Sequence, residues 1–341
     1  MPLLKKLQRT PLAGRMEEAV RKQLEKLRAE RRKRFRVLVS VKDEETLYVA
    51  RMAARLANCP TCDIILLYVR PVDRSGTIHV QLARRNILQA GVELPGLRIL
   101  RKGLEVLQEE LGLNVDECET QTAQMDAWGD PVGDAKIVYT CPDGRELVLK
   151  LKVAPEISSG ILDQYELGPY NLIILGEPVR WHRSGLWLLF HHVVAERVMA
   201  MAPCSVMVAR DTLNQKGFFI YLDGTARSYN GMRRTAVLAH EAGEPITLFA
   251  VAPTQEDVKK AQSIVNKGRD ILESLGIEVH ATKVSVGDVV EQIVEHGNDH
   301  LVIAVTDRGR TRLQRIFFGS IAGEVARRAK TSVLDVRLGE K

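Results

Sequence analysis

The sequence predicts an α/β protein of two tandem doubly wound domains, each with a mostly parallel five-stranded sheet and helices on both faces. Three observations support this fold class. Apolar runs of strand length alternate with helical patterns, as in sheets whose strands are buried on both faces. The same series of strands and helices occurs twice, at a spacing of about 160 residues. The length of 341 residues also fits two domains of ordinary size.

The chain begins with a basic segment. Residues 1–34 contain twelve Lys or Arg and four Glu, which gives a net charge of +8. A thin apolar stripe between Glu17 and Lys33 predicts a helix, so we interpret residues 1–34 as a basic N-terminal helical tail. Such a tail can contact an anionic membrane or nucleic acid, and the alternative is a helix that is solvated or packed on its own protein.

A strand, a helix and a second strand follow the tail, and this order returns after residue 216. In each half a long helix then ends at a Leu-Gly pair and precedes a predicted strand, and two further apolar strands come before the half ends. The corresponding segments, first half and then second, are 37–41 and 218–222, 46–57 and 230–242, 64–69 and 246–251, 102–115 and 267–279, 171–176 and 300–305, and 205–208 and 332–336.

These correspondences place one domain at residues 35–212 and the other at residues 216–341. The first domain carries extra residues. Within 136–153, two strand-like runs flank Pro142-Asp143-Gly144, which is typical of a β-hairpin, and a helix is predicted at 157–165.

The compartment and the cysteines are considered together. The sequence shows neither a secretory signal nor an apolar run of the roughly 20 residues that span a bilayer, so we expect a cytoplasmic protein. Five cysteines, an odd number, argue against a disulfide framework in that compartment. Cys59 and Cys62 form a lone CxxC, for which half of a metal site or a redox pair are alternatives. We expect instead a turn between a helix and a strand.

The candidate site follows the apolar strand at 301–305. In open parallel sheets, ligands bind beyond the carboxyl ends of the strands. Here Thr306-Asp307-Arg308-Gly309 comes first, and after nine residues Gly319-Ser320 opens a predicted helix at 321–330. A Gly-Ser pair at a helix start offers backbone N–H groups, a hydroxyl and the positive helix end to a phosphate. The intervening loop adds basic side chains that face either a phosphate or solvent, namely Arg308, Arg310, Arg312 and Arg315.

This segment resembles universal stress proteins of the ATP-binding branch, which carry GxxG, nine residues, and then Gly-Ser or Gly-Thr at a helix start. Thr306 stands in place of the first glycine. The resemblance implies that Asp223 and Val251 contact adenine or its ribose. It also implies that ATP or a related adenine nucleotide is bound, with or without Mg²⁺. The residues implied to line the phosphate side are Val305, Thr306, Gly309, Gly319, Ser320 and Ile321.

The first half resembles the same family more weakly, as a degenerate copy. The corresponding segment 176–179 keeps the first glycine but has Val179 at the second, and His191-His192 falls near the Gly-Ser position. One nucleotide per chain is therefore expected. The resemblance further implies that 205–209 and 333–337 pair edge to edge as an internal pseudo-dimer, and it leaves a homodimer open. In the first half, the loop between segment 176–179 and His191-His192 is apolar, because it contains Trp181, Trp187 and Phe190. This suggests packing or a partner surface.

The sequence thus favours a regulatory stress-response protein that binds an adenine nucleotide. The bound nucleotide would bias a conformation that a protein partner recognises. No catalytic residues are assigned, and slow ATP hydrolysis is the most that we expect. No metal ligands are assigned either, because no carboxylate is spaced to join His182, His191 and His192. The alternative is an adaptor or structural protein that binds no nucleotide and recruits a protein or membrane partner. A further alternative is an enzyme of another adenine-binding α/β family, which would require a catalytic motif that we do not find.

Overall fold

The structure is a computed structural model that describes residues 22, 25–26, 28–72, 95–127, 130–167, 169–176, 188–306 and 320–338. The elements of the first half are β1 (Phe35–Ser40), η1 (Glu44–Thr46), α2 (Tyr48–Leu56), β2 (Cys62–Pro71), α4 (Pro95–Leu111), η2 (Val115–Glu117), β3 (Glu119–Ala127), β4 (Asp130–Thr140), β5 (Glu146–Ala154), α5 (Ile157–Leu162), η3 (Asp163–Leu167), β6 (Leu172–Gly176), α6 (Leu188–Met201) and β7 (Ser205–Ala209). Those of the second half are β8 (Phe218–Tyr221), α7 (Ala226–Glu241), β9 (Ile246–Ala252), η4 (Gln255–Asp257), α8 (Val258–Glu273), β10 (Ala281–Val286), α9 (Val289–Gly297), β11 (Val302–Thr306), α11 (Ile321–Arg328) and β12 (Ser332–Val336).

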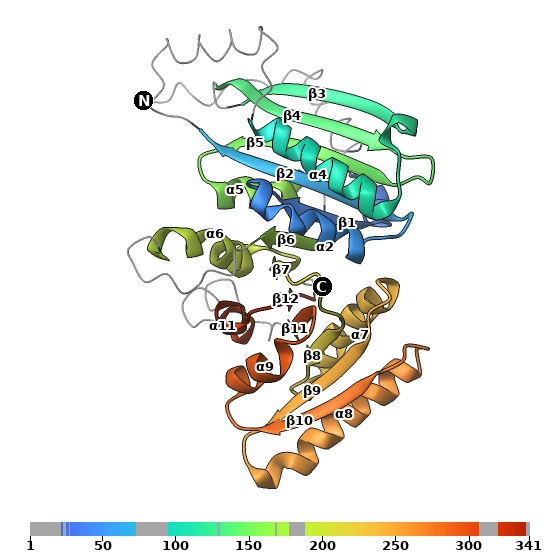
Figure 1. The fold of residues 1–341 in the computed structure, drawn as a ribbon, viewed down its shortest axis with the longest axis vertical. Coiled ribbons are helices and arrows are strands. Elements are labelled where there is room, and N and C mark those ends of the chain that lie inside the picture. The colour runs from blue at the N-terminus through green and yellow to red at the C-terminus, as the bar shows by residue number, and fades with distance from the viewer. Residues whose placement is uncertain are drawn as a thin grey trace, which may run out of the picture.

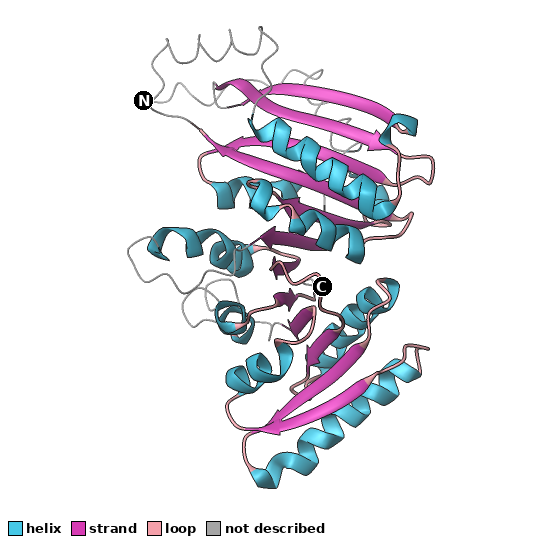
Figure 2. Ribbon diagram, viewed as in Figure 1, coloured by secondary structure: helices cyan, strands magenta, loops and turns pink. Residues whose placement is uncertain are grey.

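All these strands form one sheet (Figure 1). It has twelve strands in the order β10-β9-β8-β11-β12-β7-β6-β1-β2-β5-β4-β3. Helices cover both faces (Figure 2). One apolar core lies under α2, α4, α7 and α8, and the other lies under α5, α6, α9 and α11. The predicted α/β class with helices on both faces of a mostly parallel sheet is confirmed.

The two halves share a topology but differ in strand number. The second half has the expected five strands, in the order β10-β9-β8-β11-β12, and the first half matches them with β5-β2-β1-β6-β7. The first half also adds β4 and β3, both antiparallel, outside β5, so the prediction of five strands is wrong there. The predicted hairpin is confirmed as β4 and β5, which are joined through Gly144 at a φ of 85°.

The glycine stops of the two long helices are confirmed, but the strands begin later than predicted. Gly112 and Gly276 have φ values of 62° and 76° and end α4 and α8. The next N–H groups turn back to the helix, since Leu113 N donates to Gln108 O and Ile277 N to Leu272 O, both at 3.0 Å. Because these donors cap the helix, they do not enter the sheet ladder, and β3 and β10 start only after the cap.

The halves join through antiparallel pairing of β7 with β12, where Leu334 lies opposite Met207. This confirms the edge-to-edge pairing expected of 205–209 and 333–337. The backbone N–H of Arg210 donates to Ser332 Oγ at 3.0 Å, and that of Arg337 donates to Ser205 Oγ, also at 3.0 Å. We call this reciprocal contact the seam.

The seam buries two guanidinium groups. Arg210, which is 0% exposed, donates to Thr331 O at 2.7 Å and to Ala326 O. Arg337 donates to Ala202 O and forms an ion pair with Asp335. Each arginine follows the last strand of one half and binds carbonyl groups at the end of the last helix of the other half. Such carbonyls lack partners within their own helix, so the arginines satisfy them.

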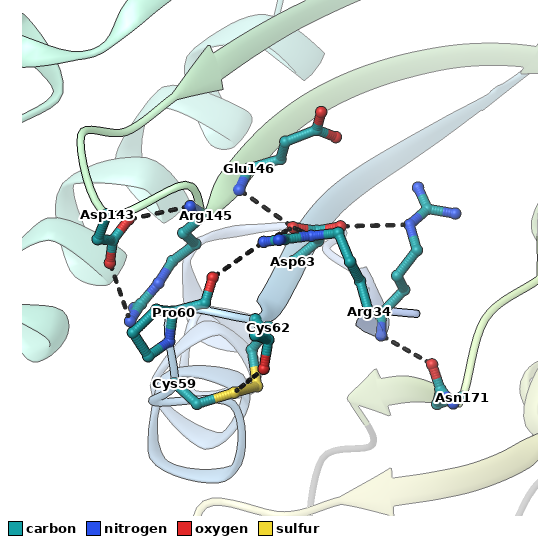
Figure 3. The surroundings of a disulfide bond; sticks show 11 residues. Arg34, Cys59, Pro60, Cys62, Asp63, Asp143, Arg145, Glu146 and Asn171 are labelled. Carbon is teal, nitrogen blue, oxygen red and sulfur yellow. Dashed lines mark hydrogen bonds and ion pairs between the residues drawn. A yellow bond between two sulfur atoms is a disulfide. The ribbon is translucent and has the colours of Figure 1, made fainter. Parts of the chain in front are cut away.

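Cys59 and Cys62 form a disulfide at the turn between α2 and β2 (Figure 3). The predicted turn is confirmed, and the argument against disulfides was wrong for this pair. Cys62 N donates to Cys59 O at 2.9 Å, and this turn bond brings the Cα atoms to 5.2 Å, within reach of a disulfide. The other cysteines are free and buried, namely Cys118, Cys141 and Cys204.

The residues beside this disulfide anchor the end of the basic tail (Figure 3). The Asp63 carboxylate is 1% exposed, accepts from Arg34 Nε at 2.7 Å and lies 3.6 Å from Arg36 Nε. It also accepts from Glu146 N at 3.1 Å, and Arg34 donates to Pro60 O within the disulfide turn. The start of β2, the start of β5 and the end of the tail are therefore fastened at one point.

Two observations concern the described part of the chain alone. Its helices are all too short or too polar to cross a membrane. Its His, Cys, Asp and Glu side chains form no group of three that could hold a metal ion.

We predict that Arg210→Met lowers the free energy of unfolding by roughly 2–4 kcal/mol, because it leaves two buried carbonyl groups without a donor. Urea unfolding followed by circular dichroism measures the change. Arg233→Met is the matched control, since Arg233 donates to Asn230 on the surface, and its effect should stay within about 0.5 kcal/mol. Equal effects of the two variants would contradict a structural role of the seam.

The cysteine pairing is tested by counting thiols. Burial raises the pKa of Cys204 to about 12, and burial with the hydrogen bond to Cys118 raises that of Cys141 to about 12. Thiolates of these two residues are therefore scarce at neutral pH, so the native protein should alkylate slowly. Mass spectrometry after alkylation in denaturant should show three adducts without a reductant and five with one. Five adducts without reductant would rule out the pair.

Candidate functional site

The candidate site lies where the strand order of the second half reverses. From β8 the chain continues to β9 on one side, whereas β11 lies on the other side, so the carboxyl ends of β8 and β11 diverge at this point. Asp223 comes two residues after β8, and Thr306 is the last residue of β11. Tyr221 is opposite Phe249 in the β8–β9 ladder, so Asp223 and Val251 each follow that pair by two residues. The sequence-predicted positions therefore meet at one edge.

The turn after β8 holds Asp223 in place. Gly224 has a φ of 80°, which suits glycine. Asp223 Oδ1 accepts from Thr225 N at 3.0 Å and from Thr225 Oγ1 at 2.7 Å. Thr225 in turn caps α7, because its hydroxyl accepts from Ser228 N at 3.1 Å. A half-buried carboxylate thus stands at the positive end of a long helix.

Tyr229, which the sequence reasoning missed, lies near enough to Asp223 to be affected by its charge. Tyr229 of α7 donates from its hydroxyl to Ile264 O at 3.2 Å, and the Lys267 ammonium lies 5.1 Å from its ring centre. Burial raises the pKa of the Tyr229 phenol, and the negative charge of Asp223 adds to this effect. An aromatic residue in a helical pattern is ordinarily core, so the sequence carries no signal that would have singled it out.

The second part of the site is the start of α11. Ser320 is its N-cap, and its hydroxyl accepts from Gly323 N at 2.9 Å. Ser320 and Ile321 are half-buried, while Val305 at the end of β11 is buried. Gly309, Gly319 and the arginines of the intervening loop lie outside the described residues. The helix therefore begins at the predicted residue, with the Ser320 side chain directed at its first turn.

Thr306, which stands where the resemblance expects glycine, packs against α7. A Cβ atom on Gly231 would overlap Thr306 Oγ1 and lie 2.6 Å from its Cγ2. Along β11, Ile303 and Val305 belong to the core under α11, so the alternate residue Thr306 faces the other side of the sheet. Its side chain therefore lies on the backbone of α7 and not over the start of α11. Gly231, a glycine inside a helical pattern, was the available signal for this contact.

The corresponding corner of the first half is filled differently. Gly176 ends β6, and a Cβ atom there would lie 2.8 Å from Val49 Cγ1 and 3.2 Å from Tyr48 Oη. Tyr48 also donates from its hydroxyl to Ala209 O at 3.3 Å. The larger side chain thus belongs to the helix in the first half and to the strand in the second half. The loop at 177–187 and the side chains of 188–193, which include the tryptophans and histidines noted above, lie outside the described part.

Residues 220–337 match the model of the universal stress protein family. A solved universal stress protein from Archaeoglobus fulgidus is 13% identical and covers 89% of this chain and 97% of its own, with a TM-score of 0.55. A functionally unknown protein from Pseudomonas aeruginosa is 14% identical and covers 90% and 94%, with a TM-score of 0.54. Because both alignments span the two halves, the first half shares the fold.

A further Archaeoglobus fulgidus universal stress protein, solved in complex with dAMP, is 20% identical. It covers 36% of this chain and 98% of its own, with a TM-score of 0.31. The search of curated proteins found no match to this chain.

The contact between Thr306 and Gly231 predicts a specific pair of effects. Gly231→Ala should lower the free energy of unfolding by roughly 1–3 kcal/mol, because the new methyl group overlaps the threonine. Adding Thr306→Gly should restore most of that loss. Thermal unfolding of both single variants and the double variant completes the cycle. Asn230→Ala, at an exposed position on the same helix, should leave stability near wild type. Additive losses in the double variant would contradict direct contact.

Proposed function

We propose that the second half binds one adenine nucleotide, ATP in the first place, and that the bound nucleotide biases a conformation that a partner protein reads. The observation that carries this proposal is the family match over 220–337, within which Asp223, Thr306 and Ser320 come from three separate elements to the switch in strand order. That place is where open α/β sheets bind ligands.

We assign the nucleotide as follows. Asp223 and Val251, at the ends of β8 and β9, would contact adenine or ribose. The start of α11 would hold the phosphates, because N–H groups at a helix start lack partners within the helix and the helix dipole favours negative charge there. The residues assigned to the phosphate side are Val305, Thr306, Gly309, Gly319, Ser320 and Ile321. Mg²⁺ would accompany the phosphates if ATP is the ligand.

The adaptor alternative depended on Thr306 filling the phosphate pocket. Its side chain instead packs on Gly231 of α7, which supports the nucleotide proposal. In the first half, Val49 and Tyr48 occupy the corner at Gly176. This supports a single site per chain, in a domain at 216–341 that is paired with a degenerate domain at 35–212. We assign no catalytic step to either domain, and the cytoplasmic location stays a prediction.

The test is direct. The purified protein is extracted with acid and any released nucleotide is identified by chromatography, and ATP is then titrated with and without Mg²⁺. Wild type should bind ATP saturably. Gly319→Trp should weaken binding at least about 100-fold, because a side chain at this point blocks close approach of phosphate to the backbone.

Ser274→Trp is the matched control. Ser274 is the C-cap residue of α8 and is exposed at the opposite edge of the sheet, so this tryptophan should leave ATP binding unchanged. No released nucleotide together with no saturable ATP binding by wild type would refute the proposal.

A further inference from the structure

The strands added to the first half carry an unusual pair of charges. In the β4–β5 ladder, Lys136 lies directly opposite Lys150. Val138 lies opposite Val148 on the same face, which belongs to the core under α5 and α6. Residues directly opposite each other in an antiparallel pair have Cβ atoms about 5 Å apart, and like charges in that arrangement are destabilising.

The neighbouring row of the same two strands shows how such charges are normally balanced. Lys152 Nζ lies 2.6 Å from Asp134 Oδ2, and Asp134 Oδ1 accepts from Val153 N at 2.8 Å. Asp134 is therefore already engaged. Among the described residues, no hydrogen bond or ion pair is made by the side chain of Lys136 or of Lys150. One row is thus neutralised and the next is not.

The surroundings increase the cost of this pair. Lys136 and Lys150 are half-buried. Burial, followed by the charges of Lys136, Lys152 and Arg31, lowers the pKa of Lys150 to about 8, and the attraction of Asp134 opposes this more weakly. Burial and then Arg31 also lower the pKa of Lys136, with Glu146 acting in the opposite direction. Positive charge is therefore in excess at a place where water screens it poorly.

We propose that Lys136 and Lys150 form a binding site for a small dianion of the phosphate class. Two ammonium groups offer six donors, and their flexible stems start close enough to reach the same tetrahedral oxyanion. Half-burial suits a small anion better than a polymer, because only a compact ligand fits between side chains on a sheet face. The site lies at the far end of the sheet from the nucleotide site of the second half and does not depend on it.

The experiment compares thermal unfolding of the full chain in rising inorganic phosphate, with ionic strength held constant by sodium chloride. A ligand that binds only the folded state raises the melting temperature, and we expect a rise of a few °C, on the order of 5 °C, for wild type. Lys150→Met should lose this rise. In phosphate-free buffer it should melt at or above the wild-type temperature, because the repulsion with Lys136 is removed.

Lys152→Met is the matched control, since it is a lysine on the same strand and face that has a carboxylate partner. It should melt below wild type in phosphate-free buffer and yet keep the phosphate-dependent rise. The measured quantity is the difference between wild type and Lys150→Met in the phosphate-dependent rise of the melting temperature. Phosphate bound in the second half raises both melting temperatures equally and drops out of this difference. Equal rises in these two proteins, or no rise in wild type, would overturn the proposal.

Discussion

The structure depends on the seam between β7 and β12. A parallel doubly wound sheet ends in a strand whose outer edge would otherwise be open to pairing with another chain. Here each half closes that edge with the other half, and Arg210 and Arg337 satisfy the helix-end carbonyls that meet there. Because the guanidinium groups are buried, loss of either leaves polar groups without partners in the interior. The seam therefore sets how the halves are oriented and makes them one sheet.

The seam joins two halves of like topology that differ in one contact between a strand end and a helix. This contact lies between β6 and α2 in the first half and between β11 and α7 in the second half. In the first half a glycine at the strand end, Gly176, accommodates Val49 of the helix. In the second half a glycine in the helix, Gly231, accommodates Thr306 of the strand. In each half the glycine leaves room for a side chain from the other element, Val49 with Tyr48 in the first half and Thr306 in the second. The halves differ in which element supplies the side chain, the helix in the first half and the strand in the second half.

Periodicity and duplication predicted most of the fold. Strands buried on both faces are continuous apolar runs, and each element predicted in one half is supported by its counterpart in the other half. The Gly319-Ser320 pair predicted the start of α11 at Ile321, and the resemblance to universal stress proteins pointed to Asp223. What they missed depends on contacts distant in sequence or on backbone bonds. Leu113 and Ile277 were predicted to lie in strands, but their backbone N–H groups donate to carbonyl groups of the preceding helix. Cys59 and Cys62 were judged by compartment, whereas their turn brings them together. The need for glycine at position 231 is explained by its contact with Thr306, which is distant in sequence.

The position of the added strands follows from the seam. Since β7 and β12 occupy each other's edges, new strands can join the sheet only at its two outer ends, beyond β10 or beyond β5. The chain uses the second of these, and β4 and β3 extend the sheet away from the corner at Thr306. Strands at such an end are free of the packing that the central strands must satisfy, so an opposed pair such as Lys136 and Lys150 is tolerable there. An addition of this kind can acquire a ligand of its own without disturbing the corner at Thr306.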